Sequence, residues 1–300
     1  MRRPPYRDLP DGRVLGLYGP DEQRGCLNAL TPERIAAAAA LVRTGEAFGL
    51  NNALDYPYPH PSGGRRKPPT HTVVRHSLGR DDWLDGFFPQ SGSQWDSFLH
   101  VRDNVHHCFY NGNTDESRGI EAWSAHGIAG RGVLLDVARH RAAKGRPIDW
   151  RARDIVTLDE LEACAAAQEV ELGDGTILLV RFGWEVGWRA ASLEERTAIA
   201  HGEFLCPGLE PDPRTVEWLW DQGLAAVAAD NYALEPFPLG EYFMHVDLLT
   251  RVGMPIGEFW HLEALAEACA REGRFEFFLT SAPLNVPGGI GSTANALAIL

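Results

Sequence analysis

The sequence predicts an α/β fold, because strand-like and helix-like segments alternate through its second half. Short apolar runs with the length of buried strands occupy residues 131–137, 176–182, 224–229 and 274–280. Segments typical of helices lie between these runs, at residues 158–168, 213–220 and 262–271. The 300 residues permit one large domain or two small ones, and 44% hydrophobic residues suffice for a substantial core.

One helix is predicted in the first half of the chain. Thr31 is a good N-cap, Pro32 suits the first helical position, and Gly45 stops the helix. Because residues 35–42 are alanine-rich and apolar, we expect this helix to be buried on most sides. The segment 56–70 is dense in Pro, Gly and basic residues, which predicts a surface loop or a lid over a site.

Charge and composition exclude several classes of protein. Lys and Arg number 28 against 41 Asp and Glu, so the net charge of −13 argues against a partner that is nucleic acid or an acidic membrane. The basic N-terminus has no apolar segment after it, and no run of about 18 apolar residues occurs. We therefore expect a cytoplasmic protein. The five cysteines are odd in number and never form a CxxC pair, so we expect reduced packing residues.

The segment that carries chemistry runs from residue 90 to residue 100. Its polar side chains are Gln90, Gln94, Asp96 and His100. On a strand, the last three share parity and point to one face, where they could form a metal shell with a general acid or base. The alternative is a polar strand edge that faces water, and spacing alone favours this alternative.

This segment resembles the metal-binding motif HxGTHxDxPxH of the cyclase superfamily, which includes bacterial kynurenine formamidase and isatin hydrolase. Gly92, Asp96 and His100 match the motif, whereas Gln90 and Gln94 stand where the family has two histidines. The resemblance continues in order over residues 13–300, through the segments 126–139, 173–184, 228–235, 245–258 and 288–299. It implies the swivelling β/β/α fold of this superfamily in a single domain, residues 1–300. An N-terminal extension, about residues 1–50, would pack on this domain.

The resemblance also implies a site. The metal ligands would be Gln90, Gln94, Asp96, His245 and Glu258, and the cofactor a divalent metal, Zn or Mn. His100 would be the proton shuttle. Because a carboxamide is a weaker ligand than imidazole, the two glutamines should weaken Zn²⁺ binding and favour Mn²⁺, or they could hold the substrate instead. The form QxxxQxDxxxH resembles the trans-dienelactone hydrolase branch of the superfamily.

Three further residues are expected to contact a small-molecule substrate. Trp95 lies within the motif, and His126 precedes a glycine-rich turn that it could instead cap. Asp230 follows an apolar strand, a place where α/β sites often gather. Arg181 interrupts an apolar strand, and we expect it to pair with a structural carboxylate.

The residues and the resemblance together predict a metal-dependent hydrolase that opens a small cyclic ester (lactone) or amide, with His100 moving the proton. A lyase or cyclase acting on a small biosynthetic intermediate is one alternative. A metal-free binding protein is another, kept open by the two glutamines. The resemblance further implies a homodimer or homotetramer.

Overall fold

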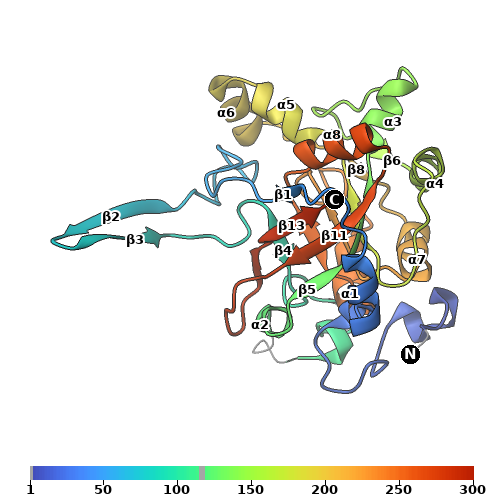
Figure 1. Ribbon diagram of the computed structural model, residues 1–300. Coiled ribbons are helices and arrows are strands. Elements are labelled where there is room, and N and C mark those ends of the chain that lie inside the picture. The colour runs from blue at the N-terminus through green and yellow to red at the C-terminus, as the bar shows by residue number, and fades with distance from the viewer. Residues whose placement is uncertain (1–2, 115–118) are drawn as a thin grey trace.

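A computed structural model describes residues 3–114 and 119–300, and a nine-stranded mixed sheet forms its centre (Figure 1). The strand order is β1-β13-β11-β5-β7-β9-β10-β4-β12. The strands are β1 (Ala47–Gly49), β4 (Gln94–Asp96), β5 (Ile128–Leu135), β7 (Ile177–Val180), β9 (Ala226–Ala229), β10 (Ile256–Glu258), β11 (Glu276–Ser281), β12 (Gly291–Thr293) and β13 (Ala296–Ile299). Strands β5, β7, β9 and β10 are parallel, and the outer strands on both sides are antiparallel to their neighbours.

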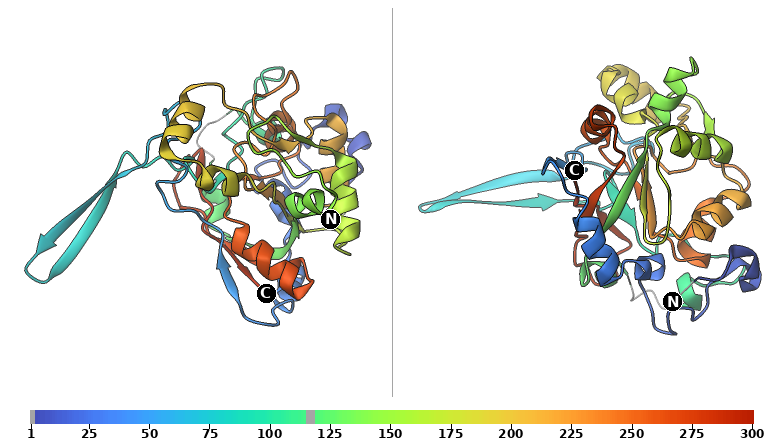
Figure 2. Two further views of the ribbon diagram at one scale, coloured as in Figure 1. Left: turned by 90° about the horizontal axis from the view of Figure 1, so that it is seen from above. Right: turned by 45° about the vertical axis from the view of Figure 1, so that its right-hand side comes forward.

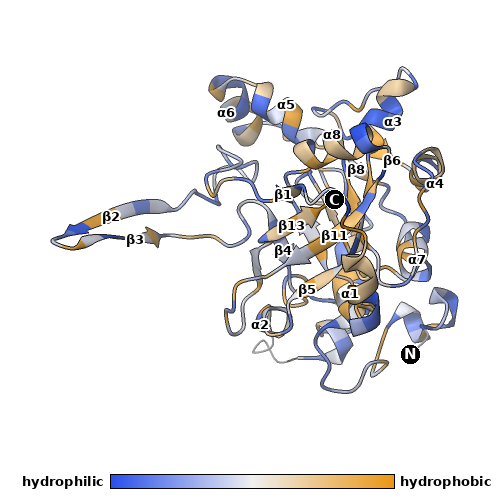
Figure 3. Cartoon of the chain, viewed as in Figure 1, coloured by the Kyte–Doolittle hydropathy of each residue, from blue (hydrophilic) through white to orange (hydrophobic). Residues whose placement is uncertain are grey.

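Helices cover both sides of the parallel strands, which explains why β7 and β9 are apolar throughout. The helices are α1 (Pro32–Ala39), α2 (Glu121–Ser124), α3 (Val137–Ala143), α4 (Leu158–Ala167), α5 (Trp184–Ala190), α6 (Leu193–His201), α7 (Pro213–Asp221) and α8 (Glu263–Glu272). Figure 2 shows α1 and α8 on one side of the central strands, with α4 and α7 on the other. In Figure 3 the apolar residues are concentrated in these central strands.

Shorter elements complete the chain. They are the single-turn helices η1 (Tyr6–Asp8), η2 (Pro10–Gly12), η3 (Gly25–Ala29) and η4 (Tyr110–Gly112), the π-helix η5 (Val246–Arg251), and a small parallel pair, β6 (Ile155–Val156) with β8 (Gly208–Leu209). No helix within the described ranges has the length and apolarity that crossing a bilayer requires.

The predicted strands and helices of the second half are confirmed, and β7, β9 and β11 are shorter than expected. The strand predicted at 131–137 ends at Leu135, because Asp136 caps the N-terminus of α3 by accepting a hydrogen bond from the Arg139 main chain. All five cysteines are buried with free thiols, so their interpretation as packing residues is confirmed.

The prediction that the first helix is buried on most sides is wrong. Helix α1 ends at Ala39, and only Ala38 along it is buried. An alanine-rich sequence reports a high helix propensity, but alanine side chains are small enough to remain in water at little cost. The helix lies against β5 and β11 along a narrow face.

A long hairpin follows the loop that was predicted at 56–70. Strands β2 (Thr70–His76) and β3 (Gly79–Asp85) pair with each other and with no other strand, and they project from the body as an arm (Figure 1). Nearly every residue of the arm is exposed. The arm was not predicted from the sequence.

Candidate metal centre

Two antiparallel strands bring the site together. In the pairing of β4 with β10, Gln94 lies opposite Glu258 and Asp96 lies opposite Ile256. Since directly paired residues point to the same face and alternate residues share it, Gln94, Asp96 and Glu258 all point to one side of the sheet. All three are buried.

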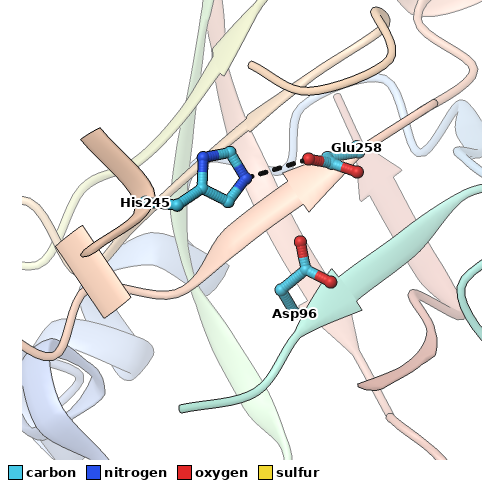
Figure 4. A group of neighbouring side chains, drawn as sticks. All are labelled: Asp96, His245 and Glu258. Atoms are coloured by element: carbon cyan, nitrogen blue, oxygen red, sulfur yellow. Dashed lines mark hydrogen bonds and ion pairs between the residues drawn. The ribbon is translucent and has the colours of Figure 1, made fainter. Parts of the chain in front are cut away.

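The residue His245, which immediately precedes η5, completes the cluster. Ligand atoms of Asp96, His245 and Glu258 all lie within 4.8 Å of one another, and Figure 4 shows the three side chains pointing toward a common centre. His245 Nε2 lies 3.1 Å from Glu258 Oε1, on the side that faces the cluster.

The other face of the His245 ring is held by Glu235. Glu235 Oε1 lies 2.7 Å from His245 Nδ1, and the same carboxylate accepts the main-chain N–H groups of Met244 and His245. This contact places the Nδ1 proton toward Glu235 and directs Nε2 to the centre of the cluster, where a metal would take the place of the Nε2 proton, a common arrangement for a histidine ligand. The segment 228–235 was included in the resemblance, but no role was predicted for Glu235.

Both glutamines donate their amide hydrogens to the acidic residues of the cluster. Gln94 Nε2 donates to Glu258 Oε2 at 2.6 Å, and Gln90 Nε2 donates to Asp96 Oδ1. Gly291 of β12 makes room for Gln90, because a Cβ atom there would lie 2.6 Å from Gln90 Cγ.

Two oxygens of the cluster remain without a partner among the described residues. Gln94 Oε1 and Asp96 Oδ2 are buried and accept no hydrogen bond. Burying a charged or polar oxygen in this way is costly unless something compensates it. A cation at the centre of the cluster would do so, and the oxygen and imidazole donors fit a divalent metal.

The electrostatics of the cluster lead to the same conclusion. Burial and the nearby Asp96 carboxylate raise the pKa of Glu258 to about 7, although His245 opposes this rise. Burial lowers the pKa of His245, but hydrogen bonds and charges of Glu235 and Glu258 outweigh it and raise the pKa to about 10. Three carboxyl groups around one imidazole leave an excess of negative charge that a divalent cation would neutralise.

The residue His100 lies at the exposed margin of this cluster. The strand ends at Asp96, so the prediction that His100 shares a strand face with it is wrong; a turn in which His100 N–H donates to Ser97 O positions it instead. His100 Nδ1 accepts from Gln90 Nε2 at 2.9 Å, and Nε2 lies 3.8 Å from Asp96 Oδ1. Burial lowers the pKa of His100, which favours a neutral ring.

The residues predicted to contact substrate lie elsewhere. Trp95 is fully buried on the opposite face of β4, and its Nε1–H donates to Ser281 Oγ at 2.9 Å. The prediction that Trp95 contacts the substrate is therefore wrong. Asp230 is buried and accepts the main-chain N–H groups of Phe182 and Gly183 at the start of α5, a structural role. His126 is exposed in the turn between α2 and β5 and makes no contact with the cluster among the described residues.

The expected structural role of Arg181 is confirmed. Its guanidinium donates to Asp136 Oδ1 at 2.7 Å and to both oxygens of Glu263, at 2.7 and 2.8 Å. These carboxylates compensate the buried charge.

Comparison with known proteins places these observations in context. The Cyclase family model matches residues 35–236. A crystal structure of a novel cyclase is 34% identical, with a TM-score of 0.83, and the match covers 96% of this chain and 99% of that one. An isatin hydrolase bound to the product analogue thioisatinate is 17% identical, with a TM-score of 0.63 and coverage of 91% and 98%.

A third solved structure, a predicted metal-dependent hydrolase from Bacillus stearothermophilus, is 16% identical, with a TM-score of 0.50 and coverage of 84% and 97%. The second and third likenesses show a shared fold. No protein of curated function matches this chain.

Proposed function

Because this chain belongs to the Cyclase family, we propose that it is a metal-dependent hydrolase that opens a small cyclic ester (lactone) or cyclic amide. The observation that carries the proposal is the buried group Asp96, His245 and Glu258, whose ligand atoms lie within 4.8 Å of one another, with His100 at its margin. Relatives of the same fold described as an isatin hydrolase and a metal-dependent hydrolase support it.

The metal would be held by His245 Nε2, the carboxylates of Asp96 and Glu258, and the unpartnered Oε1 of Gln94. One imidazole among oxygen donors suits Mn²⁺ better than Zn²⁺. When bound, a divalent cation supplies Lewis acidity, which polarises a carbonyl group and makes a water molecule more acidic.

His100 would move the proton. Since Gln90 Nε2 is a donor, Nδ1 of His100 accepts and its Nε2 carries the proton of the neutral ring. In the reaction the neutral ring would first take up the proton that the attacking water releases, at Nδ1 and with loss of the hydrogen bond from Gln90. The imidazolium ring formed in this way would then give its Nε2 proton to the oxygen or nitrogen that leaves the opened ring. The amide NH₂ groups of Gln90 and Gln94 donate to the carboxylates and would orient them, while Gln94 Oε1 stays available to the metal.

Removal of the metal tests the first part of the proposal. Hydrolysis of a panel of lactones and cyclic amides should fall after dialysis against a chelator and return when Mn²⁺ or Zn²⁺ is added. Product formed in H₂¹⁸O should contain one labelled oxygen, because hydrolysis adds water. Unlabelled product would favour a lyase or cyclase, and activity that neither falls nor returns would overturn the proposal.

Substitution of His100 tests the second part. His100→Asn should lower kcat by about 10²-fold or more, since it removes the proton carrier. Metal content by elemental analysis should stay at the wild-type level, because the side chains proposed to hold the metal are intact. Near-full activity in this variant would exclude His100 from the reaction.

A further inference from the structure

The short helix η5 (Val246–Arg251) begins directly after the residue His245 of the metal centre. It is a π-helix, after which Val252 N–H donates to Asp247 O at 2.9 Å, a spacing of five residues. Helices of this kind are rare and frequently lie at functional sites. The proposed reaction uses His245 before η5, whereas the residues at the far end of η5 have no role in it.

The far end of η5 contacts the turn that carries His100. Thr250 is buried, and its hydroxyl donates to the main-chain oxygen of Val101 at 2.6 Å. No other hydrogen bond to this oxygen occurs among the described residues. Because Val101 directly follows His100, this bond fixes the carboxyl side of the turn, while the N–H of His100, which donates to Ser97 O, fixes its amino side.

A second contact joins the same two segments. Arg251 Nε donates to Oδ2 of the buried Asp103 at 3.0 Å. The other oxygen of Asp103 accepts the main-chain N–H groups of Val105 and His106, at 2.8 and 3.2 Å. This ion pair therefore holds the chain that follows His100 against the end of η5.

These contacts make η5 a spacer between the two histidines of the site. His245 lies at one end of η5, the turn of His100 is held at the other, and the centres of the two rings are 6.5 Å apart. His100 Nε2 lies 3.8 Å from Asp96 Oδ1, at the edge of the metal centre. A displacement of a reacting group by about 1 Å is enough to slow a reaction strongly, so the position of this turn matters for proton transfer.

We propose that Thr250 is a positioning residue, whose hydrogen bond to Val101 O holds the His100 ring in place beside the metal centre. The inference rests on the proposed function, in which His100 moves the proton. It adds a residue that acts through the main chain of the turn. Arg251 supports the same turn through Asp103.

Chemical modification of histidines in the chelator-treated protein tests the proposal without metal or turnover. Thr250→Val keeps the shape of the side chain but removes the hydroxyl, so Val101 O loses its partner. Diethyl pyrocarbonate, with mass spectrometry to locate the product, should modify His100 at least about threefold faster in this variant, because a turn that has lost a hydrogen bond opens more often. Thr250→Ser, which keeps the hydroxyl, should react at nearly the wild-type rate.

Two reference histidines and a second threonine separate a loosened turn from a destabilised protein. Exposed His126 and buried His60 should react in Thr250→Val as in the wild type, since faster reaction of His60 would report unfolding of the body. Thr215→Val changes a buried threonine of α7 whose hydroxyl has no hydrogen-bond partner among the described residues. It is the matched control and should leave the reaction of His100 unchanged.

Turnover distinguishes this inference from the proposed function. With Mn²⁺ present, Thr250→Val should lower kcat for ring opening by about tenfold or more at unchanged KM and metal content, and Thr250→Ser should restore it. Modification of His100 that is unchanged in Thr250→Val, or equally faster at His60, would overturn the positioning role even if metal-dependent hydrolysis holds. Faster modification of His100 alone supports this role, and full kcat in the same variant would then contradict proton transfer by His100.

Discussion

At the scale of single residues, the orientation of His245 depends on Glu235. Glu235→Gln keeps the volume of the side chain but removes the negative charge beside Nδ1 and one of the acceptors for the main chain. We expect metal affinity to fall by about 10–100-fold, the usual effect of losing the partner of a histidine ligand. Competition with a chromogenic chelator measures this affinity. Wild-type metal affinity in the variant would show that Glu235 stabilises the fold but has no effect on the metal site.

Local pattern predicted part of this site, and the rest required contacts between distant segments. Strand alternation correctly placed Gln94 and Asp96 on one face, and the same alternation should have placed Trp95 on the other. Glu258 lies far along the chain and reaches the site only through the pairing of β10 with β4, and His245 reaches it from the segment before η5. Spacing cannot reveal such pairing, so these two were predicted from the resemblance alone.

At the scale of elements, an ion pair connects helix α5 to the segment before α8. His261 Nδ1 lies 2.9 Å from both oxygens of Glu185. The hydrogen bond to Glu185 raises the pKa of His261 against the opposing effect of burial. The folded state therefore binds the proton more tightly than the unfolded chain, whose histidine pKa is about 6.5.

The expected result is a loss of stability as the pH rises. The contribution of this pair should be complete below about pH 6.5 and should disappear as the pH rises through the higher pKa of the folded state. For a partly exposed pair we expect about 0.5–1 kcal/mol, seen as a shallower pH dependence of the free energy of unfolding in His261→Gln. Denaturant titrations from about pH 6, below the unfolded-state pKa, to about pH 9 measure it. His126→Gln, at an exposed histidine, is the matched control, and equal slopes in both variants would contradict the prediction.

The elements themselves were predictable where burial and hydrophobic pattern coincide. Strands β7 and β9 are apolar because helices cover both faces, and α4 begins at the capping box of Thr157 and Glu160. The arm has no such signal, because its exposed faces mix charged and apolar residues. The turn that carries His100 likewise has no hydrophobic periodicity by which the sequence could predict it.

At the scale of the whole molecule, packing against the body does not explain the stability of the arm, whose strands pair only with each other. A two-stranded ribbon has no core of its own and is marginally stable in water unless it packs against something. Its large apolar side chains are exposed on both faces: Val73 at 47%, Val74 at 39%, Trp83 at 49% and Leu84 at 42%. Such a surface is typical of an interaction site.

The resemblance implies a homodimer or homotetramer, and we expect the arm to pack against a second copy of this chain. A hollow of about 850 Å³ lies at the base of the arm, and its lining combines Leu54, Pro69, Trp83 and Leu84 with Asp55, His71 and Asp82. Trp83→Glu would place a charge in the contact, and the cost of burying it should shift the assembly toward monomer.

Sedimentation velocity measures the effect of Trp83→Glu. The wild type should sediment as a dimer or tetramer, and the variant as a smaller species with unchanged metal content, since the metal ligands lie in the body. Val186→Glu changes a residue of similar exposure, 47%, on helix α5 and is the matched control, expected to sediment as the wild type does. A monomeric wild type, or a Trp83→Glu variant of wild-type mass, would show that the arm does not hold copies together, because a buried charge at a real interface cannot leave association unchanged.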